Sequence, residues 1–115
     1  MDRIQLNATY PNVTAENRAE FKEVAARSLE LAKGEPGVLQ FDWFFNDDET
    51  RCVTRETYES SEALLAHVAK VGDIVGRLIE LGGGFQLEVF GTPSAQLLEA
   101  GAVFQPTVYA YFQGK

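Results

Sequence analysis

The stretch RETYESSEALLAHVAKVG, residues 55–72, decides the fold. Its first part alternates as a strand does, and Ser60 then offers an N-cap for an amphipathic helix that runs to the glycines at 82–84. The apolar stripe of this helix consists of Leu64, Val68, Val71, Val75 and Leu78. His67, the single histidine of the chain, lies on the same stripe. We therefore expect a strand that leads into a helix with an inward-pointing imidazole.

Further segments flank this stretch and complete a fold. Residues 3–10 alternate as a strand, residues 15–33 predict a helix with Thr14 as its N-cap, residues 38–46 and 51–59 predict a hairpin, and residues 85–91 alternate again. The order β-α-β-β-α-β is that of the ferredoxin-like fold. We therefore predict an α+β protein in which two helices cover one face of an antiparallel four-stranded sheet.

A short and largely apolar region follows these segments. Residues 92–101 predict a short helix with Thr92 as its cap. The aromatic tail that follows is expected to pack on its own domain or on a neighbouring subunit. We predict a single domain over residues 1–115, with its core in residues 3–91 and an extra C-terminal helix and tail in residues 92–115.

Composition excludes several kinds of partner. The net charge is −7, and no cluster of Lys and Arg follows a helix or strand, so neither nucleic acid nor an anionic membrane is an expected partner. No apolar run approaches the length of a membrane span, and MDRIQLNATYP at the start has no features of a signal peptide. Cys52 is the single cysteine, so no internal disulfide and no metal site are expected. We expect a cytoplasmic protein.

The strand at 38–46 bears on assembly. One face of this strand carries Leu39, Phe41, Trp43 and Phe45, and the other face also carries apolar side chains. Because two helices on one side leave the other side of the sheet bare, we expect a second copy to cover it. A homodimer interface of standard size, about 800 Å² per partner, is sufficient for this.

The segment EPGVLQFDWFFNDDETRCVTRETYESSEALLAHV, residues 35–68, resembles the central part of the antibiotic biosynthesis monooxygenase family. In this pattern a Pro-Gly turn enters an aromatic strand, a polar hairpin follows, and a strand ending in Glu-x-aromatic runs into a Ser-Glu-Ala helix that bears a histidine. The resemblance covers residues 3–91 in element order and residues 35–72 in local pattern.

The resemblance implies a dimeric α+β barrel whose two sheets pack face to face, with a pocket in each subunit between sheet and helices. Some members of the family oxidise polycyclic phenols or quinols with O₂ and no metal or flavin, whereas relatives degrade haem. Haem degradation needs a haem-ligating histidine further along the second helix, and residues 70–84 contain none. No cofactor is therefore expected.

We select His67, Tyr58 and Asn7 as candidate catalytic residues. His67 is either a pocket base that accepts a proton near neutral pH or a buried histidine bonded to a carbonyl or carboxylate. Tyr58 is either a hydrogen-bond donor to a substrate oxygen or a structural tyrosine. Asn7 is selected because haem-degrading relatives carry an asparagine in the first strand and quinol oxidisers also use amide groups.

Trp43, Phe41 and Glu56 are the candidate substrate-binding residues. Trp43 and Phe41 supply rings for an aromatic wall, and a buried indole N–H needs an acceptor. Glu56 shares a strand face with Tyr58 and needs a partner, which Arg55 on the other face does not provide.

These residues lead to one function and two alternatives. The first is a cofactor-independent monooxygenase that oxidises an aromatic phenol, quinol or anthrone with O₂. The second is a dimeric barrel that binds a small hydrophobic ligand, or catalyses isomerisation or cyclisation, without oxygen chemistry. The third, a purely structural interaction domain, predicts a pocket filled by the protein's own side chains.

Overall fold

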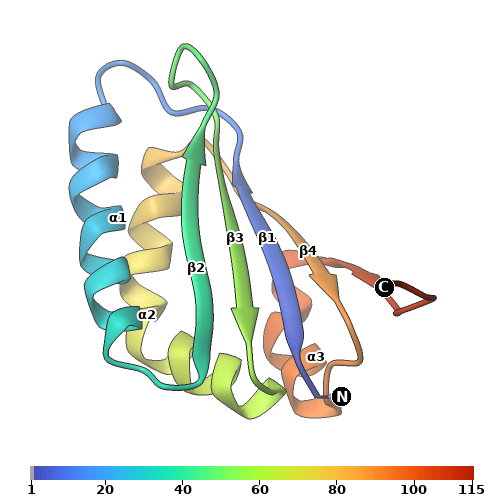
Figure 1. Ribbon diagram of the computed structural model, residues 1–115. Coiled ribbons are helices and arrows are strands. Elements are labelled where there is room, and N and C mark those ends of the chain that lie inside the picture. Colours follow the sequence, from blue (N-terminus) through green and yellow to red (C-terminus); the bar gives the residue numbers. More distant parts are fainter. Residues whose placement is uncertain (1) are drawn as a thin grey trace.

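A five-stranded mixed sheet forms the centre of the computed structural model, which describes residues 2–115 (Figure 1). The strands are β1 Ile4–Tyr10, β2 Val38–Phe45, β3 Cys52–Tyr58, β4 Gln86–Phe90 and β5 Thr107–Tyr109. Their spatial order is β2-β3-β1-β4-β5. The first four strands pair antiparallel, whereas β5 runs parallel to β4.

Two long helices lie on one face of this sheet. They are α1 Arg18–Lys33 and α2 Ser61–Leu81; in Figure 1 α2 passes behind β2, and α1 stands to the left of the strands. A shorter helix, α3 Ala95–Gly101, and a 3₁₀ turn, η1 Ala102–Phe104, follow β4. The expected β-α-β-β-α-β order and the ferredoxin-like α+β fold are confirmed.

Helix starts follow the hydroxyl side chains, with two shifts from expectation. Ser60 caps α2 as predicted, because its Oγ accepts from the backbone N–H of Ala63 at 3.1 Å. Thr14 accepts from the N–H of Asn17 at 3.3 Å, which closes a turn before α1. The cap of α3 is Ser94 instead of Thr92, since its Oγ accepts from the N–H of Leu97 at 3.1 Å. The predicted caps Thr14 and Thr92 therefore lie a few residues before the N-caps observed in the structure.

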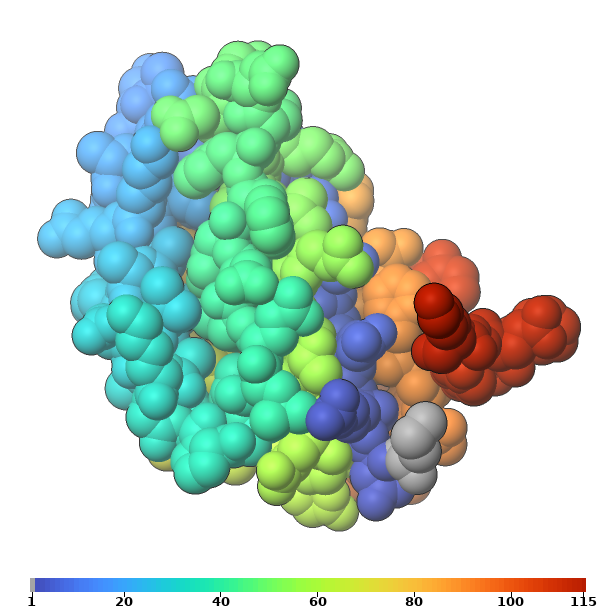
Figure 2. Space-filling model, viewed as in Figure 1, coloured from blue at the N-terminus to red at the C-terminus, as the bar shows by residue number. Residues whose placement is uncertain are grey.

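β5 is the element that the sequence pattern did not predict. It pairs through the register Glu88↔Thr107, Val89↔Val108 and Phe90↔Tyr109, so part of the expected tail becomes a fifth strand. Beyond it the tail leaves the body of the molecule (Figure 2), and Tyr111 and Phe112 are 69% and 87% exposed. In this single chain, the expectation that the aromatic tail packs is met by Phe104, whose ring contacts Phe85 at 5.0 Å between centroids, and by β5.

β2 differs from the predicted alternation near its start. A bulge between Val38 and Gln40 shifts the register against β3, and Leu39, predicted to share a face with Phe41, is 45% exposed. From Phe41 onward the prediction holds, since Phe41, Trp43 and Phe45 turn toward the helices. The extra residue of a bulge moves every later side chain relative to the first ones, which a strict period of two does not anticipate.

The core lies between the sheet and the two long helices. β1 supplies Ile4, Leu6, Ala8 and Tyr10 to it, while its alternate residues face the open side of the sheet, which is seen from the front in Figures 1 and 2. α2 packs on β1, β2 and β3. On the side of β4 and β5, the sheet faces α3 and η1 instead. These two elements do not pack closely against the sheet, so a space remains beside α2. No helix in residues 2–115 is long and apolar enough to cross a membrane.

Candidate functional site

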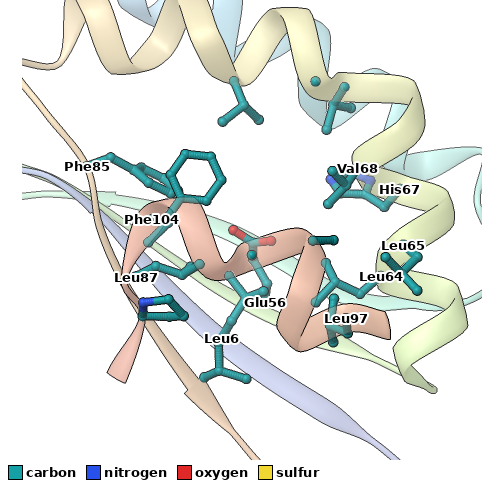
Figure 3. A pocket seen from close by; sticks show the side chains of 18 of the residues that line it. Leu6, Glu56, Leu64, Leu65, His67, Val68, Phe85, Leu87, Leu97 and Phe104 are labelled. Carbon is teal, nitrogen blue, oxygen red and sulfur yellow. The ribbon is translucent and has the colours of Figure 1, made fainter. Parts of the chain in front are cut away.

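A cavity of about 300 Å³ occupies the space between α2, the sheet and α3. Leu6 and Leu87 form its floor on the sheet, Leu64 and Val68 form a wall on α2, and the segment from Leu97 to Val108 closes the far side (Figure 3). The lining is almost entirely apolar. The expectation of a pocket filled by the protein's own side chains is therefore not met.

The carboxyl group of Glu56 is the polar group that stands in the middle of this lining. It rises from β3 toward the space between Leu6, Leu64 and Phe104 (Figure 3), although the residue is only 8% exposed. Thr54 Oγ1 donates to Oε2 at 2.5 Å, and the Tyr58 hydroxyl donates to Oε1 at 2.5 Å. All three side chains alternate onto one face of β3, so the strand itself supplies the partners that the carboxyl needs.

Burial raises the pKa of Glu56. The hydrogen bonds from Thr54 and Tyr58 and the nearby His67 oppose this by favouring the charged form. Since desolvation is the largest of these effects, a neutral carboxylic acid is more accessible at this position than at a solvated glutamate.

His67 lines the cavity from the second turn of α2. Its side chain is 4% exposed, and its Nδ1 lies 2.9 Å from Oε1 of Glu35, whose side chain is 8% exposed. The ring contacts Phe41 edge-on at 5.1 Å between centroids and Tyr58 at 5.5 Å. No side chain or backbone group in residues 2–115 hydrogen-bonds Nε2. The imidazole is therefore anchored through one nitrogen and free at the other.

The structure brings four of the six predicted site residues to this cavity. His67, Glu56, Trp43 and Phe41 all line it. Tyr58 is completely buried behind Glu56 and does not line the cavity, so it acts on the site only through that carboxyl.

Asn7 lies elsewhere. It alternates with Leu6 onto the opposite face of the sheet, where it borders a separate polar depression of about 100 Å³ with Gln5, Gln40 and Arg55. A substrate in the apolar cavity is on the other side of β1. In this chain the strand's period of two thus separates Asn7 from the other candidates.

Trp43 belongs to an aromatic layer with Tyr10 and Phe41, and all three line the cavity. Its ring stacks on Tyr10 at 6.1 Å with an interplanar angle of 8° and meets Phe41 edge-on at 5.7 Å. Its buried indole N–H has no acceptor among residues 2–115. Its role as a ring wall for a substrate stays a prediction.

Sequence patterns did not single out Glu35, Thr54 or Tyr10. Glu35 follows α1 by two residues in a turn, and the only signal for it is that an inward-facing histidine requires a polar partner. Thr54 lies two residues before Glu56 on the same strand face, so the alternation of the strand could have identified it as a partner of Glu56. Tyr10 lines the cavity at the end of β1, and burial, followed by the charge of Glu56, raises its pKa above the ordinary value of a tyrosine.

No group of three or more His, Cys, Asp or Glu side chains among residues 2–115 is arranged to hold a metal ion. The imidazole of His67 and the carboxyl of Glu56 both line the apolar cavity, and each is a side chain able to transfer a proton.

Residues 4–71 match the model of the antibiotic biosynthesis monooxygenase family, and the chain belongs to that family. The family that the sequence pattern indicated is thereby confirmed. No curated protein sequence matches the chain.

Solved structures share the fold. MupZ from Pseudomonas fluorescens is 21% identical with a TM-score of 0.80, and the alignment covers 98% of this chain and 92% of MupZ. Rv0793 from Mycobacterium tuberculosis is 17% identical with a TM-score of 0.70, covering 81% and 97%. SnoaB from Streptomyces nogalater, a cofactor-independent oxygenase, is 17% identical with a TM-score of 0.63, covering 83% and 97%. At these identities the likeness describes the fold.

Proposed function

We propose that this protein is a cofactor-independent monooxygenase that oxidises an aromatic phenol, quinol or anthrone with O₂. The observation that carries the proposal is the unpartnered Nε2 of His67 at the edge of an apolar cavity of about 300 Å³. Membership of the antibiotic biosynthesis monooxygenase family and the fold shared with SnoaB support it.

The reaction requires a base and a site that excludes water. Nε2 of His67 accepts the proton of an acidic phenol or anthrone, and the resulting anion passes one electron to O₂. The radical and superoxide then combine into a peroxide anion, which takes a proton and loses water to leave a quinone. For an anthrone, a CH₂ group and O₂ become C=O and H₂O, so atoms and electrons balance without a further reductant.

The cavity contributes by orientation and by excluding water. Trp43 and Phe41 offer ring faces and edges against which an aromatic substrate stacks. Apolar walls remove water that would otherwise solvate the anion and slow its oxidation. The charge that develops is then balanced by the imidazolium of His67.

Oxygen uptake with a panel of hydroquinones and anthrones, in buffer treated to remove metals, tests this proposal. We expect uptake with at least one class, and we expect His67→Ala to lower turnover about tenfold or more. Lys70→Ala is a matched control, because Lys70 lies on the exposed side of the same helix. Equal turnover in the His67→Ala protein would remove this residue from the mechanism.

The raised pKa of Glu56 favours a second candidate function. A neutral carboxylic acid in an apolar cavity can donate a proton to a bound oxygen atom, which is the step that an isomerisation or cyclisation requires. In that case ligands bind in the cavity with no oxygen consumed. The same uptake assay separates the two functions, since binding without consumption supports the second.

We also propose that the working unit is a homodimer built on the open face of the sheet. Neither α1 nor α2 covers this face, and Phe44 and Leu39 on β2 are 52% and 45% exposed. Burial of such side chains against a second copy is favourable. Sedimentation equilibrium at micromolar concentration is expected to give twice the chain mass of 12.7 kDa; a single-chain mass would contradict this.

A further inference from the structure

We propose that Glu35 is a positioning residue that holds His67 in one tautomer, with the proton on Nδ1 and the lone pair on Nε2. The catalytic consequence rests on the proposed function, whereas the tautomer itself does not. Neither residue pattern nor family membership assigns a role to Glu35.

The turn at residues 34–37 fixes the backbone of Glu35 on both sides. Its N–H donates to the carbonyl of Ala32 at 3.0 Å, and its carbonyl accepts from the N–H of Val38 at 3.0 Å. Pro36 restricts the chain between these two bonds. The side chain of Glu35 therefore starts from a fixed backbone position, and it is packed among other groups, being 8% exposed.

Gly37 holds this turn against the first part of α2. A Cβ added at Gly37 would lie 2.7 Å from Cβ of Ala63, so only glycine permits the approach. The carbonyl of Gly37 also accepts from the N–H of Glu59 at 2.9 Å. Ala63 precedes His67 by about one helical turn. The contact therefore places the carboxyl of Glu35 beside the imidazole of His67.

The hydrogen bond between the two side chains selects the tautomer. A neutral imidazole can carry its proton on either nitrogen, and a carboxylate has only acceptor sites. With Oε1 of Glu35 at 2.9 Å, the proton lies on Nδ1 and the lone pair lies on Nε2. Phe41 and Tyr58 contact the ring and restrict its rotation about χ2. The nitrogen without a protein partner is therefore the basic one.

The position of Glu35 keeps its charge away from the reacting end of the cavity. Glu35 contacts His67 without lining the cavity, whereas Glu56 lines it directly. When His67 accepts a proton on Nε2, its Nδ1–H keeps its hydrogen bond to Oε1 of Glu35. Glu35 thus acts on the substrate only through His67.

Nitrogen-15 NMR of the imidazole tests the tautomer directly. Because His67 is the single histidine, its two ring nitrogens give the only imidazole signals of the chain. With the pH raised until the ring is neutral, shown by nitrogen shifts that no longer change with pH, we expect a protonated Nδ1 and an unprotonated Nε2 in the wild-type protein. A wild-type spectrum with the proton on Nε2 would overturn the inference, whatever the activity.

Two substitutions at Glu35 separate positioning from simple packing. In Glu35→Ala the tautomer preference should be lost, and kcat should fall about tenfold or more with KM changed less than about twofold. In Glu35→Gln the amide oxygen still accepts from Nδ1–H, so part of the preference and part of kcat should return. Unchanged kcat in Glu35→Ala, or equal loss in both variants, would contradict the positioning role.

The exposed Glu59 provides the control, since Glu59→Gln removes a nearby charge without touching His67. If the spectrum shows Nδ1 protonated but no phenol, quinol or anthrone is oxidised, the proposed function fails and the tautomer assignment stands. Should Glu35→Ala not fold, the wild-type spectrum and the Glu35→Gln spectrum still decide the assignment.

Discussion

The hydroxyl of Tyr58 donates to Oε1 of Glu56 at 2.5 Å, two residues back on the same strand. Tyr58 is fully buried and Glu56 lines the cavity, so the pair connects the packed core to the site. Removing the Tyr58 hydroxyl leaves Glu56 with Thr54 as its donor, whereas removing the Glu56 carboxyl leaves the Tyr58 hydroxyl without its acceptor.

Tyr58→Phe should lower the free energy of unfolding by about 1–3 kcal/mol, because it leaves a buried carboxyl oxygen with one partner fewer. Urea denaturation followed by fluorescence measures this. Tyr111→Phe serves as the control, since Tyr111 is 69% exposed and its loss should change stability by less than about 0.5 kcal/mol. Equal effects of the two substitutions would contradict a structural role for the Tyr58 hydroxyl.

Glu56→Gln should change how stability depends on pH. Burial raises the folded-state pKa of Glu56 above its ordinary value of 4.5, so the folded protein binds this proton more tightly than the unfolded chain does. The stability contributed by the protonated group is complete below pH 4.5 and is lost as pH rises through the folded-state pKa. Relative to Glu56→Gln, the wild type should therefore become less stable as pH rises above this point.

Denaturant unfolding of both proteins between pH 4 and 8 checks this prediction. The difference between the two proteins isolates Glu56, because all other titrating groups are shared. A difference that is constant with pH, or that grows in favour of the wild type, would show that Glu56 is not held toward its neutral form.

Gly72→Ala and Gly76→Ala should each stabilise the protein. Both glycines lie inside α2, where glycine is destabilising by roughly 0.5–1 kcal/mol relative to alanine. A Cβ at either position would meet no atom within 4 Å, and both residues line the cavity. We therefore expect higher stability together with weaker binding of a ligand large enough to fill the cavity.

Gly37→Ala is the matched control for these two variants. There the added Cβ would lie 2.7 Å from Cβ of Ala63, so the same substitution should destabilise the protein. Thermal unfolding and a titration with a hydrophobic fluorescent ligand measure both properties. If Gly72→Ala and Gly76→Ala bind such a ligand as tightly as the wild type, the open space beside α2 does not limit ligand size.

The thiol of Cys52 should not react in the folded protein. Its side chain is completely buried, and desolvation raises its pKa to about 12. At pH 8 a thiol-specific reagent should therefore label the protein only after denaturant is added. Rapid labelling without denaturant would indicate that β3 opens readily from the sheet.

Alternation and helical spacing were sufficient for most of the fold. The two long helices and the first four strands were predicted within a few residues, because each has one apolar face of clear period. β5 was not predicted, because its three exposed residues show no alternation of apolar and polar side chains. The strand depends on pairing with β4. Leu39 was misplaced because a bulge interrupts the period of β2.

The site was harder to predict for a related reason. His67, Glu56, Trp43 and Phe41 lie on inward faces of elements with a clear period, so pattern alone brought them to one side of the sheet. Asn7 was selected by resemblance, although its position in the alternation of β1 already placed it on the other face. Glu35 lies in a turn, where no period exists and the direction of a side chain depends on tertiary contacts.

The far wall of the cavity has one further consequence. α3, η1 and β5 contribute Leu97, Phe104 and Val108 to that wall, yet they stand outside the β-α-β-β-α-β unit that buries most of the core. Leu97 belongs to the core cluster, whereas Phe104 and Val108 are 39% and 41% exposed. Substitutions at Phe104 and Val108 should therefore reshape the ligand wall at a smaller cost in stability than substitutions in the core.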